Sequence, residues 1–290
     1  MNLEKLKMLL TISDCKTLTR TAEETGYTQS GISNIIRSLE GELGFPLLHR
    51  LHKGVTLTEE ALRLVPIIRE LENGNEQLRQ VVAEIRGLET GTVRVASVIS
   101  VSLRWLPKIF KHFQTNYPRI AIELYEGGDQ EVLRWVDEGR ADLAFCCEQP
   151  HVEHDWLPLV EDELVAVLPE EHLMAKESAF PLSAFTRMPF IMMPGEYHQE
   201  TRAIFEKFRI APDVQFSATD DNTTIAMVEE GLGLSMLSRI ILTANPHRRV
   251  RFLPLDPPCP RILGIALRPR HRRSPATEKF IAVSQAIMKP

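Results

Sequence analysis

Polar side chains suited to nucleic acid gather on one face of the segment from Thr28 to Leu43, TQSGISNIIRSLEGEL. Its apolar residues recur at helical spacing, which predicts a buried stripe with a polar face opposite. That face carries amide, hydroxyl and guanidinium groups and no carboxylate before Glu40. These groups can bond phosphate oxygens and base edges, so the predicted chemistry is binding of double-stranded DNA. The predicted contacts from this helix are Thr28, Gln29, Ser30, Ser33, Asn34 and Arg37.

A second, shorter helix is needed to position this face. Leu18 to Thr25 has the pattern of such a helix, and Gly26-Tyr27 follows as a turn. Ala22 supplies a small residue where two helices would touch, and Gly26 supplies the conformational freedom of the turn. The pattern favours a helix-turn-helix, and its structural alternative is a pair of amphipathic helices in an ordinary bundle. A helix over residues 3–12 is predicted to complete the core.

A basic hairpin is predicted directly after the polar helix, from Leu47 to Thr58. Gly44 and Pro46 end the helix before it. The first strand and the tip carry His49, Arg50, His52 and Lys53 without an acidic residue. Such a hairpin could be a wing that contacts the DNA backbone or, alternatively, a solvated hairpin. The wing interpretation assigns Arg50, His52 and Lys53 to DNA binding and residues 1–58 to a DNA-binding domain.

Residues 59–89 are predicted to form one long helix that begins after the capping residue Thr58. Its apolar residues repeat every seven positions, with Asn75 as a polar interruption of the kind that fixes register. A helix of this length with an apolar seam needs a partner, most simply a second copy of itself. The predicted dimerisation residues are Leu64, Leu71, Leu78, Val82 and Ile85.

Strands and helices alternate from residue 90 to the end of the chain, which indicates an α/β domain with parallel sheets. We expect two lobes with a cleft between them. Lobe I is expected to span about 90–162 and 267–290, and lobe II about 163–266. Turns after the predicted strands should converge on the cleft, where hydroxyl groups and helix N-termini suit a carboxylate or another small anion. The predicted effector-binding residues are Ser100, Ser102, Gly128, Met193, Gly195 and Thr219.

Ser100 has an alternative interpretation, because it falls at the start of a predicted helix. In that position it could be an N-cap that stabilises the helix without contacting a ligand.

Composition restricts the remaining classes. The chain has 290 residues and a net charge of −5, so DNA affinity must come from the placement of charges. No signal sequence or membrane-spanning apolar run is present, and four unevenly spaced cysteines form no disulfide framework. The expected location is the cytoplasm, without a membrane partner. Cys146, Cys147, His151 and His154 superficially suggest a metal cluster, but their spacing matches no usual zinc pattern, so no metal is predicted.

At this point the chain resembles the LysR-type transcriptional regulators along its whole length. The matching stretches are LTRTAEETGYTQSGISNIIRSLEGELGFPLLHR, GVTLTEEA, GTVRVAS, YPRIAIEL, GRADLAF and VEEGLGLSML. The resemblance implies a winged helix-turn-helix, a dimer through the linker helix, and a two-lobed effector domain like a periplasmic binding protein. Matched position by position, Gln29, Ser30, Ser33 and Arg37 fall on the DNA face and Arg50 at the start of the wing. Asn34 stands where a longer side chain is common in the family.

The predicted function is therefore sequence-specific DNA binding by a transcriptional regulator that responds to a small molecule between its lobes. Its partners would be double-stranded DNA, the effector and a second copy, with a dimer of dimers as the family's usual assembly and RNA polymerase as a candidate. The alternative is a solute-binding or catalytic α/β protein with an N-terminal dimerisation domain. No nucleophile elbow, phosphate loop or dinucleotide fingerprint is present, so an enzyme and a bound cofactor are not predicted.

Overall fold

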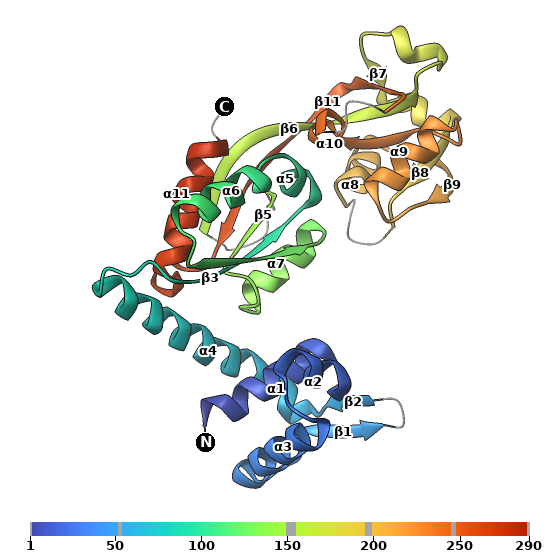
Figure 1. Ribbon diagram of the computed structural model, residues 1–290. Helices are drawn as coiled ribbons and strands as arrows, with labels where there is room; N and C mark the ends of the chain where they lie inside the picture. Colours follow the sequence, from blue (N-terminus) through green and yellow to red (C-terminus); the bar gives the residue numbers. More distant parts are fainter. Residues whose placement is uncertain (1, 52–53, 149–154, 195–198, 245–247, 289–290) are drawn as a thin grey trace. The chain divides into compact units, whose positions relative to one another are not determined.

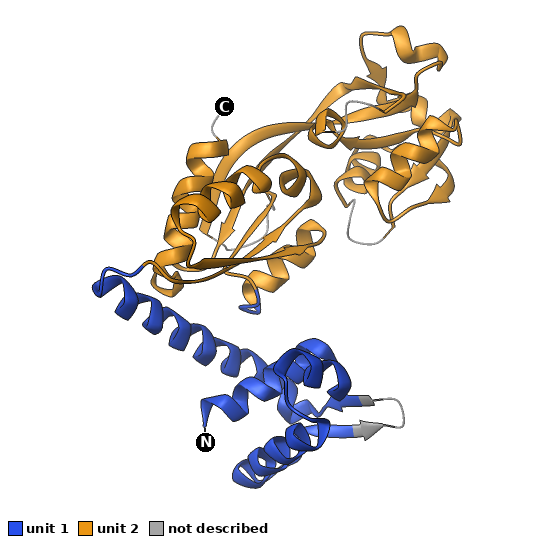
Figure 2. Ribbon diagram, in the orientation of Figure 1, with its two compact units in different colours: residues 1–88, 138–140 blue, residues 89–137, 141–290 orange. Residues whose placement is uncertain are grey.

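The computed structural model describes residues 2–51, 54–148, 155–194, 199–244 and 248–288. The chain divides into two compact units, shown in Figure 2. The first contains residues 1–88 and 138–140, and the second contains residues 89–137 and 141–290. The division after residue 88 falls beside the predicted start of the effector domain at residue 90.

The first unit packs helices around a small apolar core. Its elements are α1 (Leu3–Cys15), α2 (Leu18–Thr25), α3 (Gln29–Leu43), β1 (Leu48–Leu51), β2 (Gly54–Leu57) and α4 (Glu59–Ile85). Leu9, Ile32 and Leu39 are fully buried between α1 and α3. Gly26 ends α2 and Gly44 ends α3, both at positive φ, the conformation glycine adopts without strain. The predicted helix-turn-helix is thus present, with a hairpin after it.

Helix α4 begins at a buried cap. The Thr58 hydroxyl accepts a hydrogen bond from the N–H of Ala61 at 3.2 Å and donates one to the carbonyl of Pro46 at 3.0 Å. It therefore ties the start of α4 to the turn that precedes the hairpin. The helix passes through Pro66 and ends at Ile85, earlier than predicted, because Gly87 takes a left-handed conformation.

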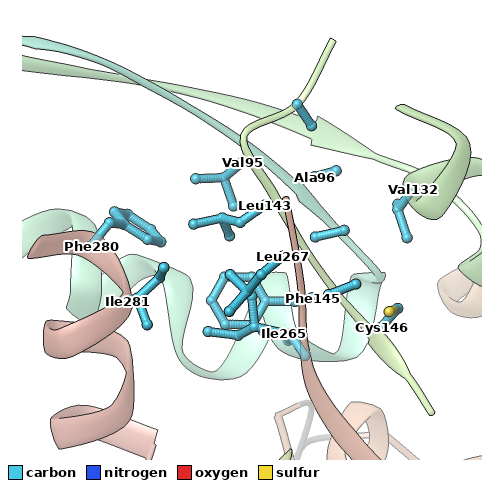
Figure 3. Packing of buried hydrophobic residues seen from close by; sticks show 14 of the residues in the cluster. Val95, Ala96, Val132, Leu143, Phe145, Cys146, Ile265, Leu267, Phe280 and Ile281 are labelled. Carbon is cyan, nitrogen blue, oxygen red and sulfur yellow. The ribbon is translucent and has the colours of Figure 1, made fainter. Parts of the chain in front are cut away.

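The first lobe of the second unit surrounds the parallel strands β4, β3 and β5. Its elements are β3 (Gly91–Ser97), α5 (Ile99–Arg104), α6 (Leu106–Asn116), β4 (Ile120–Glu126), α7 (Asp129–Asp137), β5 (Leu143–Cys147) and α11 (Pro275–Met288). Figure 3 shows Phe280 and Ile281 of α11 beside Phe145 and Leu143 of β5. The C-terminal helix therefore closes this core.

Two long strands, β6 (Asp155–Pro169) and β11 (Val250–Leu267), run from one lobe to the other (Figure 1). They pair antiparallel along their length, with irregularities between Pro254 and Cys259 and between Leu263 and Gly264. The sheet is therefore mixed: β4, β3 and β5 are parallel as predicted, whereas the two long strands add antiparallel pairs that were not predicted. Residues 263–266 were predicted in lobe II, but they pair with β5 and are buried in the first lobe's core.

The second lobe is built on the other ends of the crossing strands. Its elements are β7 (Phe180–Pro181), β8 (Pro189–Met192), α8 (Gln199–Phe208), β9 (Asp213–Ser217), α9 (Asp221–Glu229), β10 (Ser235–Ser238) and α10 (Arg239–Ala244). Phe180, Phe185, Phe190 and Phe205 form its aromatic core. Among the helices of the described residues, none combines the length and apolar character that crossing a membrane requires.

Replacing Phe280 with Ala should destabilise the second unit by about 3–5 kcal/mol. Its ring is fully buried and contacts Phe110, Phe113 and Phe145, with the Phe113 centroid 5.1 Å away. Urea denaturation followed by circular dichroism measures the effect as a lower transition midpoint.

Phe208→Ala is the matched control, because that side chain is 38% exposed. It should change stability much less. Equal losses in the two variants would show that the Phe280 ring cluster is not what stabilises the domain.

Candidate functional site

The polar face of α3 is exposed in the structure as the sequence predicts. Thr28 is the N-cap, and its hydroxyl accepts a hydrogen bond from the N–H of Gly31 at 3.1 Å. Gln29, Ser30, Asn34 and Arg37 are exposed, whereas Ser33 is half-buried. The structure brings these residues together on one helix beside its N-terminus, where anions are favoured.

Side chains on this face also orient one another. The Gln29 amide donates a hydrogen bond to the Thr19 hydroxyl at 3.1 Å, and Arg37 donates one to the Asn34 carbonyl oxygen at 2.9 Å. Thr19 lies in the first turn of α2 and was not predicted in the site. Its position two residues after the capping Thr17 was the available signal.

The nearest carboxylate on α3 is held by the turn that follows the helix. Glu40 Oε1 accepts hydrogen bonds from the backbone N–H groups of Leu47 at 2.7 Å and Leu48 at 3.3 Å. It thus serves as a link between α3 and the hairpin.

The predicted wing is an antiparallel hairpin of β1 and β2, in which Arg50 is paired with Val55. His52 and Lys53 lie outside the described residues. Their predicted phosphate contacts therefore stay predictions.

The predicted dimerisation seam divides into two parts along α4. Leu64 is half-buried and packs against the core of the first unit, beside the buried Ile68. Leu71, Leu78 and Ile85 are 51%, 62% and 80% exposed, and Val82 is 39% exposed. The C-terminal part of the seam is thus an apolar surface within the single chain.

A pocket of about 170 Å³ lies between the two lobes of the effector domain, where β6 and β11 cross. Ser100, Gly128, Met193 and Thr219 line it, as the sequence predicts. Ser102 is buried but is not among the lining residues, and Gly195 lies outside the described residues. The lining residues that sequence reasoning missed are Val98, Ile99, Glu126, Gly127, Asp129, Glu200, Asp220, Asp221, Ser238, Ile241 and Arg261.

Ser100 is not the cap of α5. Val98 occupies the N-cap position without a side-chain hydrogen bond, so the capping alternative for Ser100 is wrong. The Ser100 hydroxyl instead accepts a hydrogen bond from Arg261 Nη2 at 3.4 Å.

Arg261 joins the elements around the pocket. Its Nε donates to Asp162 Oδ2 at 2.8 Å, on the other crossing strand, and its Nη1 donates to Glu200 Oε2 at 2.7 Å, on α8. Asp162 also accepts a hydrogen bond from the Ser238 hydroxyl at 2.7 Å. Since Ser100 is in lobe I and Glu200 in lobe II, this one guanidinium contacts both lobes and the strand beside it.

Apart from Arg261, the charged residues in the described lining are all acidic. Asp129 begins α7, and its Oδ1 accepts the N–H of Cys147 at 2.6 Å. Burial, with a smaller contribution from Glu200, raises the pKa of Asp129 to about 6. A carboxylate oxygen of Asp129, a carboxylate oxygen of Glu200 and the Cys147 Sγ all lie within 4.8 Å of one another. Carboxylates from opposite lobes therefore face each other across the pocket.

The absence of a metal cluster at Cys146, Cys147, His151 and His154 stays a prediction, because the two histidines lie outside the described residues. Cys146 points into the apolar core shown in Figure 3, and His151 and His154 lie outside the described residues. Burial also raises the pKa of the Cys146 and Cys147 thiols well above their usual value, which keeps them protonated.

Comparison with known proteins gives matches along both units. The family model "Bacterial regulatory helix-turn-helix protein, lysR family" matches residues 3–62, and "LysR substrate binding domain" matches residues 86–289. The uncharacterized HTH-type transcriptional regulator YvbU of Bacillus subtilis (strain 168) is 28% identical over 99% of each chain.

Solved structures share the fold. A full-length OxyR variant from Pseudomonas aeruginosa matches with a TM-score of 0.74 at 19% identity, over 99% of this chain and 94% of that chain. Full-length CbnR in complex with its target DNA gives 0.68 at 17% identity over 99% of both chains. The Synechocystis PCC6803 CcmR regulatory domain in complex with 2-PG gives 0.63 at 20% identity, over 68% of this chain and 97% of that one.

The matched models cover more than half of the chain, in the order in which the structure shows a helix-turn-helix and a two-lobed α/β domain. The chain belongs to the LysR family of bacterial helix-turn-helix transcriptional regulators.

Proposed function

We propose that this LysR-family regulator binds operator DNA through α3 and the wing, and that a small molecule in the interlobe pocket alters that binding. The observation that carries the proposal is the pocket lined from both lobes beside Arg261. A ligand that contacts both lobes at once favours one arrangement of the lobes over others. Such differential binding is what a ligand-controlled regulator requires.

The proposed DNA contacts are Thr28, the N-cap of α3, the polar residues Gln29, Ser30, Ser33, Asn34 and Arg37 of α3, and Arg50, His52 and Lys53 in the wing. Thr28 and Ser30 lie at the N-terminus of α3, where phosphate is favoured, and Gln29 and Ser33 can reach base edges. The hydrogen bond to Thr19 supports this role for Gln29, because it restricts the amide before DNA binds.

We further propose that the exposed seam of α4 pairs with α4 of a second copy, so that two α3 helices reach one operator. A dimer of dimers, contact with RNA polymerase and a cytoplasmic location are extensions of this proposal from the family. The catalytic alternative has no support from a sequence motif.

The lining residues give two opposing indications about the charge of the effector. Ser100 and Thr219 offer hydroxyl groups to a carboxylate or another small anion, as predicted. The acidic lining, however, weighs against an anion. The pocket volume lies below the roughly 300–1,000 Å³ of typical ligand pockets, which supports a small ligand.

Thr219→Trp should abolish the response of DNA binding to the effector. Thr219 is exposed and lines the pocket, so an indole there would fill the space with little effect on folding. The measurement is a gel-shift titration of DNA from upstream of the neighbouring gene, with and without a protein-free extract of small molecules. An unchanged response in the variant would refute the pocket as the effector site.

Gln29→Ala should weaken binding to the preferred operator by about 1–3 kcal/mol and relax base preference at one position. The reason is loss of an amide that reaches base edges. Fluorescence anisotropy on operator variants measures both effects, and Gln114→Ala, an exposed glutamine on α6, is the matched control.

Arg50→Ala provides the contrasting case. A phosphate contact should weaken binding to all sequences similarly and reduce the salt slope by about one. Altered base preference with an unchanged slope would contradict the assignment of Arg50 to the wing's backbone contact.

The double substitution Leu71→Asp/Leu78→Asp should dissociate the dimer. Both side chains are exposed within one chain, so the change places charge in the proposed interface while sparing the described core. Light scattering gives the mass directly. Leu173→Asp, at a leucine that is 95% exposed in lobe II, should leave the dimer intact. An undiminished dimer in the double variant would disprove the seam.

A further inference from the structure

We infer that the interlobe pocket binds an effector carrying a positive charge, with an ammonium group of that effector held between Asp129 and Glu200. This inference rests on the proposed function of the pocket and names its ligand class. It reverses the charge predicted from the hydroxyl groups of the cleft.

The charge balance of the lining is the first observation. Five carboxyl groups line the pocket, those of Glu126, Asp129, Glu200, Asp220 and Asp221. Among the described lining residues, Arg261 alone carries a positive charge. Arg261 already donates to Glu200 and, outside the lining, to Asp162. Its positive charge is thus offset, and an anion entering the pocket would meet an excess of negative charge.

The geometry of Asp129 and Glu200 is the second observation. Asp129 stands at the start of α7 in lobe I, and Glu200 is in the first turn of α8 in lobe II. Their carboxylate oxygens lie within 4.8 Å of each other in the pocket that both residues line. Two like charges at this separation repel each other. Arg261, which bonds Glu200, offsets only part of this repulsion, because the pKa of Asp129 remains raised, so a proton or a further cation between the two carboxylates would be favourable.

The groups around the pair indicate how such a cation is recognised. Arg261 approaches from β11, and the Cys147 thiol lies at the end of β5. The other carboxyl groups of the pocket belong to Glu126 at the end of β4 and to Asp220 and Asp221 at the start of α9. The raised pKa of Asp129 reflects the cost of its charge in this place, and a bound ammonium lowers that cost. The exposed Thr219 hydroxyl can bond the rest of the ligand, and the Ser100 hydroxyl, which already accepts a hydrogen bond from Arg261, can still donate one.

The inference includes a dependence on pH. The pKa of Asp129 in the folded protein is about 6, so its carboxylate is ionised at pH 8 and mostly protonated at pH 5. A cation binds the ionised form. Its affinity should therefore be full at pH 8 and fall by about tenfold by pH 5, as protons occupy the site.

The test uses three four-carbon probes of similar length: 1,4-diaminobutane, 1,4-butanediol and succinate. We expect 1,4-diaminobutane at millimolar concentration to raise the Tm of the full chain at pH 8, and the diol and the diacid to have no effect. Calorimetric titration then gives its affinity at pH 8 and pH 5. Stabilisation by succinate instead, or no stabilisation by the diamine, would overturn the inference.

Asp129→Asn and Glu200→Gln test the site itself. Each retains a carbonyl oxygen for its existing hydrogen bond and removes a charge, so diamine affinity should fall about tenfold or more. Glu170→Gln makes the same chemical change at an exposed residue outside the pocket and should leave affinity unchanged. Equal affinity in wild type and both pocket variants would overturn the inference.

Two further measurements separate the possible failures. Without ligand, Asp129→Asn should raise the Tm at pH 8 more than at pH 5, because it removes a charge that burial disfavours; an equal or negative effect contradicts the inference. If succinate binds and Thr219→Trp abolishes its binding, the pocket remains the effector site and only the ligand class is wrong. If Thr219→Trp leaves probe binding and the DNA response unchanged, the proposed function fails as well.

Discussion

The effector domain depends on one guanidinium that is only 13% exposed. Arg261 lies where β6 and β11 cross between the lobes, and it bonds Asp162, Glu200 and Ser100 from three different elements. Removing a guanidinium from water is costly, so it is stable there only because carboxylates surround it. The same contacts connect both lobes to the crossing strands. A ligand that competes with Arg261 for Glu200 would therefore weaken a contact that connects the two lobes.

The DNA-binding unit uses its polar groups differently. Thr28 and Thr58 cap helices, and Glu40 holds the turn before the hairpin, so these residues fix the frame through bonds to backbone groups. Gln29 and Arg37 remain exposed on α3, each bonded to a neighbouring polar side chain. The frame is thus held by buried or local bonds, while the α3 residues that we propose as DNA contacts face solvent.

The cysteines of this chain have packing roles in the fold. All four cysteines of this chain are buried and free, and the thiols of Cys146 and Cys147 are held protonated by burial. Cys146 contributes to the apolar core of the first lobe, and Cys147 offers its N–H to Asp129. Cys146 thus stabilises the core by packing, and the Cys147 backbone helps to position Asp129 in the pocket.

Features that depend on neighbours along the chain could be predicted from the sequence. Thr17, Thr28 and Thr58 mark helix starts, glycines mark helix ends, and helical spacing separates the buried from the exposed face of α3, because each of these signals is local. The family motifs were likewise local in sequence. The contacts of Arg261 with Ser100, Asp162 and Glu200 could be seen only in the folded chain. The same is true of the proximity of the Asp129 and Glu200 carboxylates. These residues come from strands and helices tens of residues apart in the sequence. No periodic pattern of residues predicts the antiparallel pairing of β6 and β11 that brings them together. The sign of charge in the pocket was therefore decided by long-range packing, which no local pattern of hydroxyl residues could reveal.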